Sequence, residues 1–428
     1  MKILLKNTNQ LWQEDEQYTC DILIEDRQIK KMDQNINEKA DEVIDCTGKL
    51  AVPGFIDVHI HLREPGGEHK ETIRTGSLAA ACGGFTTVCA MPNTTPVPDN
   101  TEDVQALLEK IEQDAAVRVL PYAAITKGLK GKELTDISEL AKEEIFAFTD
   151  DGVGIQTADQ MLRAMREAAQ AGKPIVAHCE DNSIVYGGVL HDGKVSERLD
   201  LPGIPSLSES VQIARDVLLA EAADCHYHVC HVSTKESVRV IRDAKKAGIK
   251  VTAEVTPHHL LLNEEDVPGN DANYKMNPPL RAREDQQALI EGLLDGTIDF
   301  IATDHAPHAS EEKADGFLKA PFGIVGLETA FPLLYTYMVK TNKITLKQLV
   351  DWLTVRPAEV FNLPYGTLEV NAVADITLID LDKQSIINKD HFYSKGRNTP
   401  FHGWDVEGIP ILTISEGRIV YKEDYNNG

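Results

Sequence analysis

The chain is short of basic residues. It has 43 lysines and arginines against 68 aspartates and glutamates, which gives a formal net charge of -25 and a pI near 4.9. Nucleic acids and anionic membrane surfaces bind clustered lysine and arginine, so this balance argues against either as the main partner. An anionic small molecule would need a local cationic pocket.

Targeting signals and paired cysteines are also lacking. The first residues, MKILLKNTNQLWQEDEQ, have neither the apolar core nor the small-residue cleavage site of a signal peptide. No apolar run elsewhere is long enough to cross a bilayer. The seven cysteines contain no CxxC pair, so neither a disulfide framework nor a thiolate zinc site is predicted. We therefore expect a cytoplasmic protein with buried free thiols.

What the sequence does contain, between about residue 50 and residue 340, is a regular alternation of strands and helices. Eight short apolar segments predict strands, and amphipathic helical segments follow nearly all of them. The strand segments are KLAVPGFIDVHIHL, GFTTVCAM, VRVLPYAAIT, IFAFTD, KPIVAHC, CHYHVCHVS, IKVTAEVTP and TIDFIATDHA. Strand then helix, repeated eight times, is typical of a parallel α/β barrel of the TIM type.

The two ends of the chain have a different pattern. Residues 1–50 and 365–428 carry short alternating segments with turn residues between them and no long helix. We therefore expect a (β/α)8 barrel in residues 51–364 and a small β domain built from both termini. Within the barrel region, His308 to Gly323 form a long polar loop, and loops of this kind often act as lids.

The first predicted barrel strand places polar residues at every second position. Asp57, His59 and His61 share one face of the strand, while Ile56 and Val58 share the other. Active sites of such barrels lie at the carboxyl ends of the strands, where a polar residue predicts a function. One face of this strand therefore packs in the core, and the other is predicted to contribute to an active site.

Histidines and aspartates recur at five of the predicted strand ends. They are His59 and His61 in strand one, Asp150 and Asp151 in strand four, His178 in strand five, His231 in strand six and Asp304 in strand eight. Imidazole and carboxylate ligands suit a cation such as zinc. Four histidines and two carboxylates, one of them from strand four, are too many ligands for one tetrahedral ion. The pattern therefore indicates two metals with a bridging carboxylate and a bridging hydroxide that hydrolyses the substrate.

Each of these residues also has an ordinary structural interpretation. Asp151 could begin a turn, and His178 could be a hydrogen-bonded core group. The joint pattern is much harder to produce by chance, because polar side chains are seldom buried without a partner. By strand phase, His226 and His228 face away from His231, and we expect a structural role for both.

Several of these segments together resemble the dihydroorotase family, in its bacterial class with long chains within the amidohydrolase superfamily. The segments are GFIDVHIHLREPGGEHKETIRTG, AMPNTTPVPD, FAFTDDGVG, VAHCEDN, CHYHVCHVSTKES, AEVTPHHLLL, KMNPPLR and IATDHAPH. The resemblance implies a distorted (β/α)8 barrel with a composite β-sandwich from the two termini. It also implies the reversible, zinc-dependent cyclisation of N-carbamoyl-L-aspartate to L-dihydroorotate and water in pyrimidine (UMP) biosynthesis.

The resemblance further implies a role for each site residue. His59 and His61 would bind one Zn²⁺, His178 and His231 a second, and Asp151 would bridge the two ions of the chain. Asp304 would be a metal ligand and the catalytic acid/base, acting with a metal-bound hydroxide. Arg63, Asn93 and His308 would bind the substrate carboxylate, while Asn277 and the backbone of Phe322 and Gly323 would hold the ring amide.

Arg63 and the strand-four aspartates need separate comment. A guanidinium pairs with a carboxylate through two parallel hydrogen bonds, so Arg63 would supply the cationic pocket that an acidic protein otherwise lacks. Many superfamily members bridge their metals with a carboxylated lysine at the end of strand four, but the strand-four segment EEIFAFTDDG, which follows Lys142, contains no lysine. Asp151 is the natural substitute, and Asp150 is an alternative that strand phase does not exclude.

Two other functions remain to be compared. A dihydropyrimidinase, hydantoinase or allantoinase would share the fold and the metal site, but an arginine directly after HxH and the absence of the strand-four lysine favour the dihydroorotase resemblance. A non-catalytic scaffold for aspartate transcarbamoylase would have lost ligands, and none of the expected set is missing. Besides the small-molecule substrate, we expect a homodimer and an association with aspartate transcarbamoylase.

Overall fold

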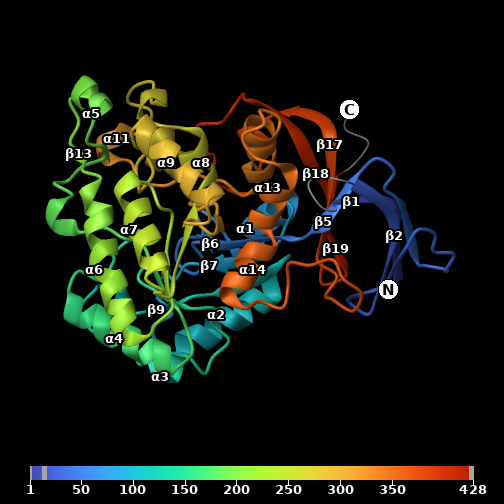
Figure 1. Cartoon of the computed structure of the whole chain (residues 1–428), viewed down its shortest axis with the longest axis horizontal. Helices are drawn as coiled ribbons and strands as arrows, with labels where there is room; N and C mark the ends of the chain where they lie inside the picture. Colours follow the sequence, from blue (N-terminus) through green and yellow to red (C-terminus); the bar gives the residue numbers. More distant parts are fainter. Residues whose placement is uncertain (1, 12–16, 424–428) are drawn as a thin grey trace.

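The protein consists of a helix-rich body and a smaller sheet at one side of it (Figure 1). The structure, a computed structural model, describes residues 2–11 and 17–423. The first and last strands, β1 (Lys2–Leu11) and β19 (Arg418–Lys422), both belong to the sheet. Among the described residues, no helix combines the length and the apolar character that crossing a membrane would require.

The helix-rich body contains the predicted barrel. Its strands are β6 (Phe55–Ile60), β7 (Phe85–Ala90), β8 (Arg118–Pro121) with β9 (Ala123–Ala124), β10 (Phe148–Thr149), β11 (Ile175–Ala177), β14 (Tyr227–Val229), β15 (Val251–Val255) and β16 (Phe300–Ile301). Neighbours pair in parallel in this order, and a bridge from Ile60 to His305 joins the last segment to β6. Each of the eight predicted segments contains a barrel strand, although two of the segments are each divided into two strands. The predicted fold class is confirmed.

Helices surround these strands. The longer ones are α1 (Ile73–Cys82), α2 (Thr101–Asp114), α4 (Ala158–Gln170), α6 (Leu207–Ala223), α7 (Lys235–Lys246), α9 (Arg283–Leu294), α13 (Leu346–Leu353) and α14 (Val355–Phe361). The shorter ones are α3 (Ile137–Leu140), α5 (Lys194–Leu199), α8 (Pro257–Leu261), α10 (Ser310–Lys313), α11 (Gly316–Lys319) and α12 (Ala330–Leu334). Gly172 and Gly248 lie just after α4 and α7 and have φ of 68° and 83°. A helix often ends with a residue in this left-handed conformation, which favours glycine.

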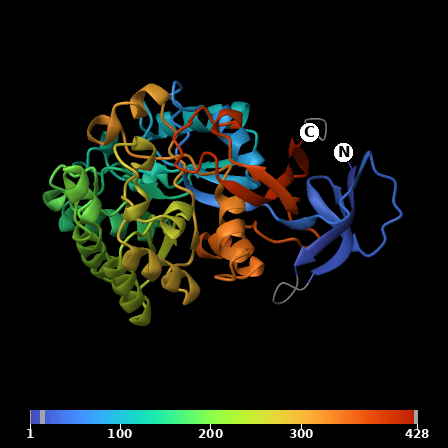
Figure 2. The ribbon, with the colours of Figure 1, turned by 90° about the horizontal axis from the view of Figure 1, so that it is seen from above.

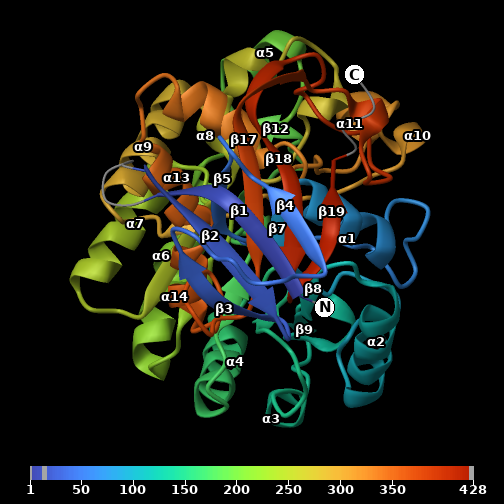
Figure 3. The same cartoon turned by 90° about the vertical axis from the view of Figure 1, so that its right-hand side faces the viewer.

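The second part is a sheet of eight strands from both ends of the chain (Figures 2 and 3). They are β1 (Lys2–Leu11), β2 (Gln17–Glu25), β3 (Gln28–Asp33), β4 (Glu42–Asp45), β5 (Leu50–Pro53), β17 (Ile376–Ile386), β18 (Asp405–Ser415) and β19 (Arg418–Lys422). The two halves join where β5 pairs antiparallel with β17. The composite sheet was expected, while the exact division at residues 50 and 364 stays a prediction.

The segment KLAVPGFIDVHIHL is not one strand, as predicted, but two. β5 belongs to the composite sheet and β6 to the barrel, with Gly54 between them. A Cβ at Gly54 would lie 2.1 Å from Thr86 Oγ1, so the chain can pass here only without a side chain. This close passage joins the two parts of the molecule directly before the first barrel strand.

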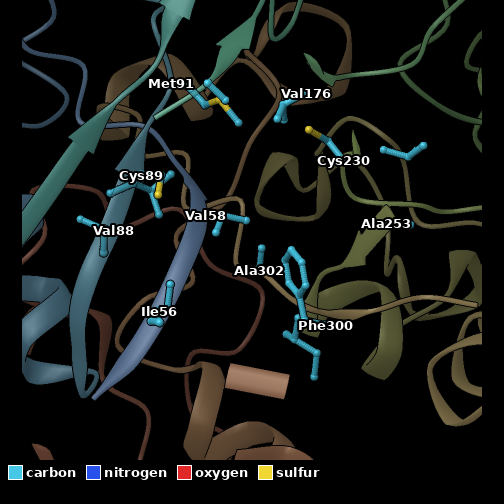
Figure 4. Packing of buried hydrophobic residues seen from close by; sticks show 14 of the residues in the cluster. Ile56, Val58, Val88, Cys89, Met91, Val176, Cys230, Ala253, Phe300 and Ala302 are labelled. Atoms are coloured by element: carbon cyan, nitrogen blue, oxygen red, sulfur yellow. The ribbon is translucent and has the colours of Figure 1, made fainter. Parts of the chain in front are cut away.

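Each part has its own apolar core. The barrel core includes Ile56 and Val58 of β6 together with Val88 and Phe300, which Figure 4 shows in one packed cluster. A separate cluster that includes Ile22 lies in the composite sheet. Full burial of a side chain of this size contributes roughly 1.5–3 kcal/mol, so the barrel core is stable enough to hold polar groups at its open end.

Candidate metal centre

The predicted metal ligands meet at the carboxyl ends of the barrel strands. His61 directly follows β6, Asp151 lies two residues after β10, His178 directly follows β11, and His231 lies two residues after β14. Asp304 lies three residues after β16. These side chains are buried, and together with His59 they form one cluster.

One half of the cluster is built by β6. His59 Nε2 lies 3.5 Å from Asp151 Oδ1, and His61 Nε2 lies 3.6 Å from Asp151 Oδ2. Ligands of a tetrahedral zinc ion are about 3.3–3.6 Å apart when each metal bond is 2.0–2.2 Å. Asp304 joins this half, with Oδ1 3.1 Å from His61 Nε2 and 3.5 Å from His59 Nε2. The spacing therefore fits a cation.

The other half is built by β11 and β14. His178 Nδ1 and His231 Nε2 are 3.0 Å apart, and each lies 4.0 Å from Asp151 Oδ1. Asp151 thus stands between the two histidine pairs. The distances from the Asp151 carboxylate to the histidine nitrogens are therefore longer in this half than in the half built by β6.

Several ring and carboxylate atoms of the cluster are buried without a hydrogen-bond partner. They are His59 Nε2, Asp151 Oδ1 and His231 Nδ1. Burial would lower the pKa of His59, but the acidic groups around it raise that pKa well above its usual value. Burial would raise the pKa of Asp151, and the nearby His59, His61 and His178 rings lower it overall. The cluster therefore favours added positive charge, as a metal site does.

The structure separates the two strand-four aspartates. Asp150 Oδ1 accepts hydrogen bonds from the backbone N–H groups of Ile125 and Thr126, at 2.8 and 2.9 Å, and Asp150 Oδ2 accepts one from the Thr126 hydroxyl. Burial raises the pKa of Asp150 to about 6. Asp150 thus binds the segment that directly follows β9, while Asp151 faces the histidines.

A cavity of about 160 Å³ opens above the cluster. It is lined by His61, Arg63, Asn93, Asp151, Gly152, His178, His231, Asn277, Asp304, Ala306, Phe322 and Gly323. His308 stands beside it, with Nε2 3.4 Å from an Arg63 guanidinium nitrogen and 2.8 Å from the Phe322 carbonyl oxygen. Every predicted substrate contact therefore lies in or next to this cavity.

The cavity offers both charge and amide groups. Burial lowers the pKa of His308 to about 2, and the Arg63 guanidinium is the second cause of this shift. The imidazole is therefore neutral, and Arg63 is the cation of the pair. Asn277 Nδ2 donates to Glu180 Oε2 at 2.8 Å, which leaves its amide oxygen to accept from a ligand. Asn93 Oδ1 lies 3.0 Å from His61 Nδ1 and so also supports a metal-ligand candidate.

The loop from His308 to Gly323 is held in place by two buried lysines. Lys313 Nζ donates to the carbonyl oxygens of Lys275, Pro321 and Gly323 at 3.1, 2.9 and 3.0 Å. Lys275 Nζ donates to the Ala320 carbonyl at 2.6 Å and lies 4.4 Å from the centre of the Phe322 ring. The two lysines thus hold the loop in place where Phe322 and Gly323 line the cavity, while its role as a lid stays a prediction.

Three residues of the site have positive φ although they are not glycines. The values are 61° for Arg63, 30° for His231 and 50° for Asp304. This region costs a residue with a side chain roughly 1–3 kcal/mol, and such residues cluster at functional sites. Contacts with the surrounding structure must therefore hold these three residues in their conformations at a cost in folding stability.

One residue near the candidate metal ligands was missed from the sequence. Glu254, the fourth of the five residues of β15, places Oε1 2.7 Å from His59 Nδ1 and Oε2 3.1 Å from His228 Nε2. Burial would raise the pKa of Glu254, but the two histidines lower it to about 2. Cys230 also lies near His59 and Glu254. A glutamate inside the apolar segment KVTAEVT was the available signal.

A barrel that gathers four histidines and two aspartates at its strand ends, below a cavity with an arginine, defines an enzyme of the amidohydrolase type. A family model described as dihydro-orotase-like matches residues 48–237. A dihydroorotase from Listeria innocua is 62% identical over 423 residues, which are 99% of both chains. A dihydroorotase from Staphylococcus epidermidis is 64% identical over 94% of this chain and 96% of its own. The chain belongs to the dihydroorotase family.

Solved structures support the same enzyme class. An L-hydantoinase (dihydropyrimidinase) from Arthrobacter aurescens matches with a TM-score of 0.87 and 26% identity over 98% of this chain and 96% of its own. A dihydropyrimidinase from Brevibacillus agri matches with a TM-score of 0.87 and 25% identity, covering 99% and 95%. The expected family and the expected class, a cyclic amide hydrolase, are confirmed.

Proposed function

We propose that the chain catalyses the reversible closure of N-carbamoyl-L-aspartate to L-dihydroorotate in pyrimidine biosynthesis. The observation that supports this most directly is the position of Arg63, whose guanidinium lines the cavity next to the histidine and aspartate cluster. Both substrate and product carry a carboxylate beside the amide that reacts. A cation at the rim of the metal centre is therefore the group that this substrate requires.

The metal centre would hold two zinc ions. His59 and His61 would bind one and His178 and His231 the other, with Asp151 between them, as the spacing and the unpartnered buried atoms support. Bound there, the ions would polarise the ring carbonyl and lower the pKa of a water molecule between them. Zinc, rather than another cation of similar ligand preference, is our choice from the nitrogen and carboxylate donors.

The protein groups would position the substrate and move protons. Arg63, with Asn93 and His308 beside it, would bind the carboxylate, and Asn277 would accept a hydrogen bond from the ring amide. The Phe322 carbonyl has a second lone pair for the same amide, and the backbone of Gly323 would close this side. Asp304 would take the proton of the attacking water and deliver it to the leaving ring nitrogen, and would do the reverse during ring closure.

A second candidate is hydrolysis of an uncharged ring, as the names of the matching hydantoinase and dihydropyrimidinase structures suggest. That activity would use the same metal centre, but it would give Arg63 no partner. The two candidates therefore differ at this one side chain.

The test is ring opening by the purified, zinc-supplemented protein, with L-dihydroorotate compared against dihydrouracil, hydantoin and allantoin. Metal content is measured on the same sample. Selective turnover of L-dihydroorotate with about two zinc ions per chain supports the proposal. Selective turnover of the uncharged rings would leave the metal centre in place and refute the role of Arg63, and zinc binding without turnover would favour a scaffold.

Partners and location follow from this role. We propose a small-molecule substrate, a homodimer, an association with aspartate transcarbamoylase and a cytoplasmic location. Analytical ultracentrifugation of the purified chain, alone and with aspartate transcarbamoylase, tests both assemblies.

A further inference from the structure

Glu254 is a buried carboxylate that contacts both halves of the metal centre although it does not line the cavity. Its Oε1 lies 2.7 Å from His59 Nδ1, in the half built by β6. The backbone N–H of His231, in the other half, donates to the same oxygen at 3.4 Å. One carboxylate oxygen thus joins a side chain of the first half to the backbone of the second.

The Glu254 carboxylate is itself held from the opposite side. Its Oε2 lies 3.1 Å from His228 Nε2, and His228 Nδ1 lies 2.8 Å from Thr252 Oγ1. The His228 ring stacks on Phe300, with ring centres 5.2 Å apart and planes at 3°, and Phe300 lies in the packed barrel core (Figure 4). Because His228 is fixed on all these sides, the carboxylate has little freedom to turn.

This arrangement selects one form of the His59 ring. A carboxylate only accepts hydrogen bonds, so the hydrogen of neutral His59 lies on Nδ1. The Nε2 lone pair then points away from Glu254, and Nε2 is the atom that lies 3.5 Å from both Asp151 and Asp304 without a hydrogen-bond partner. A ring with its hydrogen on Nε2 could not bind a cation there.

We propose that Glu254 is the positioning residue of the metal centre. It fixes the orientation and the Nδ1–H form of His59. Through the hydrogen bond from the His231 backbone N–H, it also holds the two halves of the metal centre in position relative to each other. His228, which the strand phase assigns to the structural side, holds Glu254 in turn. This inference rests on the proposed metal site.

The experiment measures zinc affinity of metal-free protein by competition with a chelator. Partners of this kind typically change metal affinity by about 10- to 100-fold. We expect Glu254→Ala to weaken zinc binding toward 100-fold, and Glu254→Gln, which keeps an oxygen facing His59, to weaken it about tenfold. Asp216→Asn is the matched control, because Asp216 is an equally buried carboxylate that binds Arg215 and the Tyr227 hydroxyl instead. It should bind zinc as the unchanged protein does.

A spectroscopic measurement separates positioning from packing. In NMR of the zinc-loaded protein, the Nδ1–H of His59 should be protected from exchange with water by its hydrogen bond to Glu254, and Glu254→Ala should lose this protection. Unchanged zinc affinity in the Glu254 variants, even with a lower melting temperature, would overturn the inference and leave Glu254 a packing residue. If Glu254→Ala does not fold, unchanged affinity in Glu254→Gln decides the same way. If the unchanged protein binds no zinc, the proposed function fails instead.

Discussion

Replacing Asp304 by asparagine tests the proposed division of labour in the metal centre. The carboxamide has nearly the same shape as the carboxylate, but it cannot accept and return a proton. General acid–base groups typically contribute about 10²–10⁴-fold to a rate, which corresponds to about 2.7–5.4 kcal/mol of activation free energy. We expect the Asp304→Asn variant to lose turnover of L-dihydroorotate by at least this range.

Metal content should not follow the activity. His59, His61 and Asp151 remain on the same side of the centre, and their spacing of 3.5–3.6 Å fits a tetrahedral ion. Three protein ligands are enough to hold a catalytic zinc ion. The zinc content of the Asp304→Asn variant should therefore stay at the level of the unchanged protein, as measured by elemental mass spectrometry on the sample used for the rates.

Asp299→Asn is a suitable control for the change of charge. Asp299 lies just before β16, at the opposite end of the strand that leads to Asp304. It accepts hydrogen bonds from Lys245 Nζ at 2.7 Å and from the Ala253 backbone N–H at 2.8 Å. Turnover by this variant should be retained. If zinc content falls with activity in Asp304→Asn, the residue acts mainly as a ligand and the acid/base assignment is refuted.

Other side chains allow shorter tests. Arg63→Ala should raise the KM for L-dihydroorotate about 100-fold, because it removes two charge-assisted hydrogen bonds of about 1.5 kcal/mol each. The KM for dihydrouracil should stay unchanged. Equal effects on both substrates would contradict the proposal. Burial, with Arg281 beside it, lowers the pKa of His191 to about 4, so the unfolded chain binds a proton between pH 6.5 and 4 that the folded chain does not. Stability should fall across this window by up to about 3 kcal/mol on acidification, and thermal melts should show a weaker pH dependence in His191→Asn. Tyr122→Phe should lower the free energy of unfolding by about 1–3 kcal/mol in denaturant titrations, because the Tyr122 hydroxyl donates to the buried Val58 carbonyl at 2.8 Å. A change below 0.5 kcal/mol would mean that water replaces this hydrogen bond.

The strand ends could be predicted from the sequence because two simple rules act together. Side chains alternate along a strand, and all strands of a parallel barrel end at the same rim. His61 and His178 each follow directly on an apolar strand, so both could be placed at the rim without knowledge of any contact. The choice between Asp150 and Asp151 could not be made, since it depends on the backbone of Ile125 and Thr126, which directly follow the neighbouring strand β9.

Contacts between distant residues explain what the sequence did not reveal. Glu254 lies 195 positions from His59, and nothing local indicates that these two side chains meet. The break at Gly54 has the same origin, because its cause is the approach of Thr86 from the next strand. Local pattern therefore predicts which groups reach the rim, whereas the groups that orient them from below depend on tertiary packing.

The position of Asp151 predicts that the two proposed metal sites differ in strength. Asp151 Oδ1 is 3.5 Å from His59 Nε2 but 4.0 Å from the nearest nitrogens of His178 and His231. Tetrahedral ligands at zinc bond lengths are about 3.3–3.6 Å apart, so the first half already has the required spacing and the second must contract to reach it. A short side chain fixed to the end of β10 cannot move toward both halves at once. Stepwise chelation should therefore remove first the ion held by His178 and His231, and simultaneous loss of both ions would show that Asp151 serves the two halves equally.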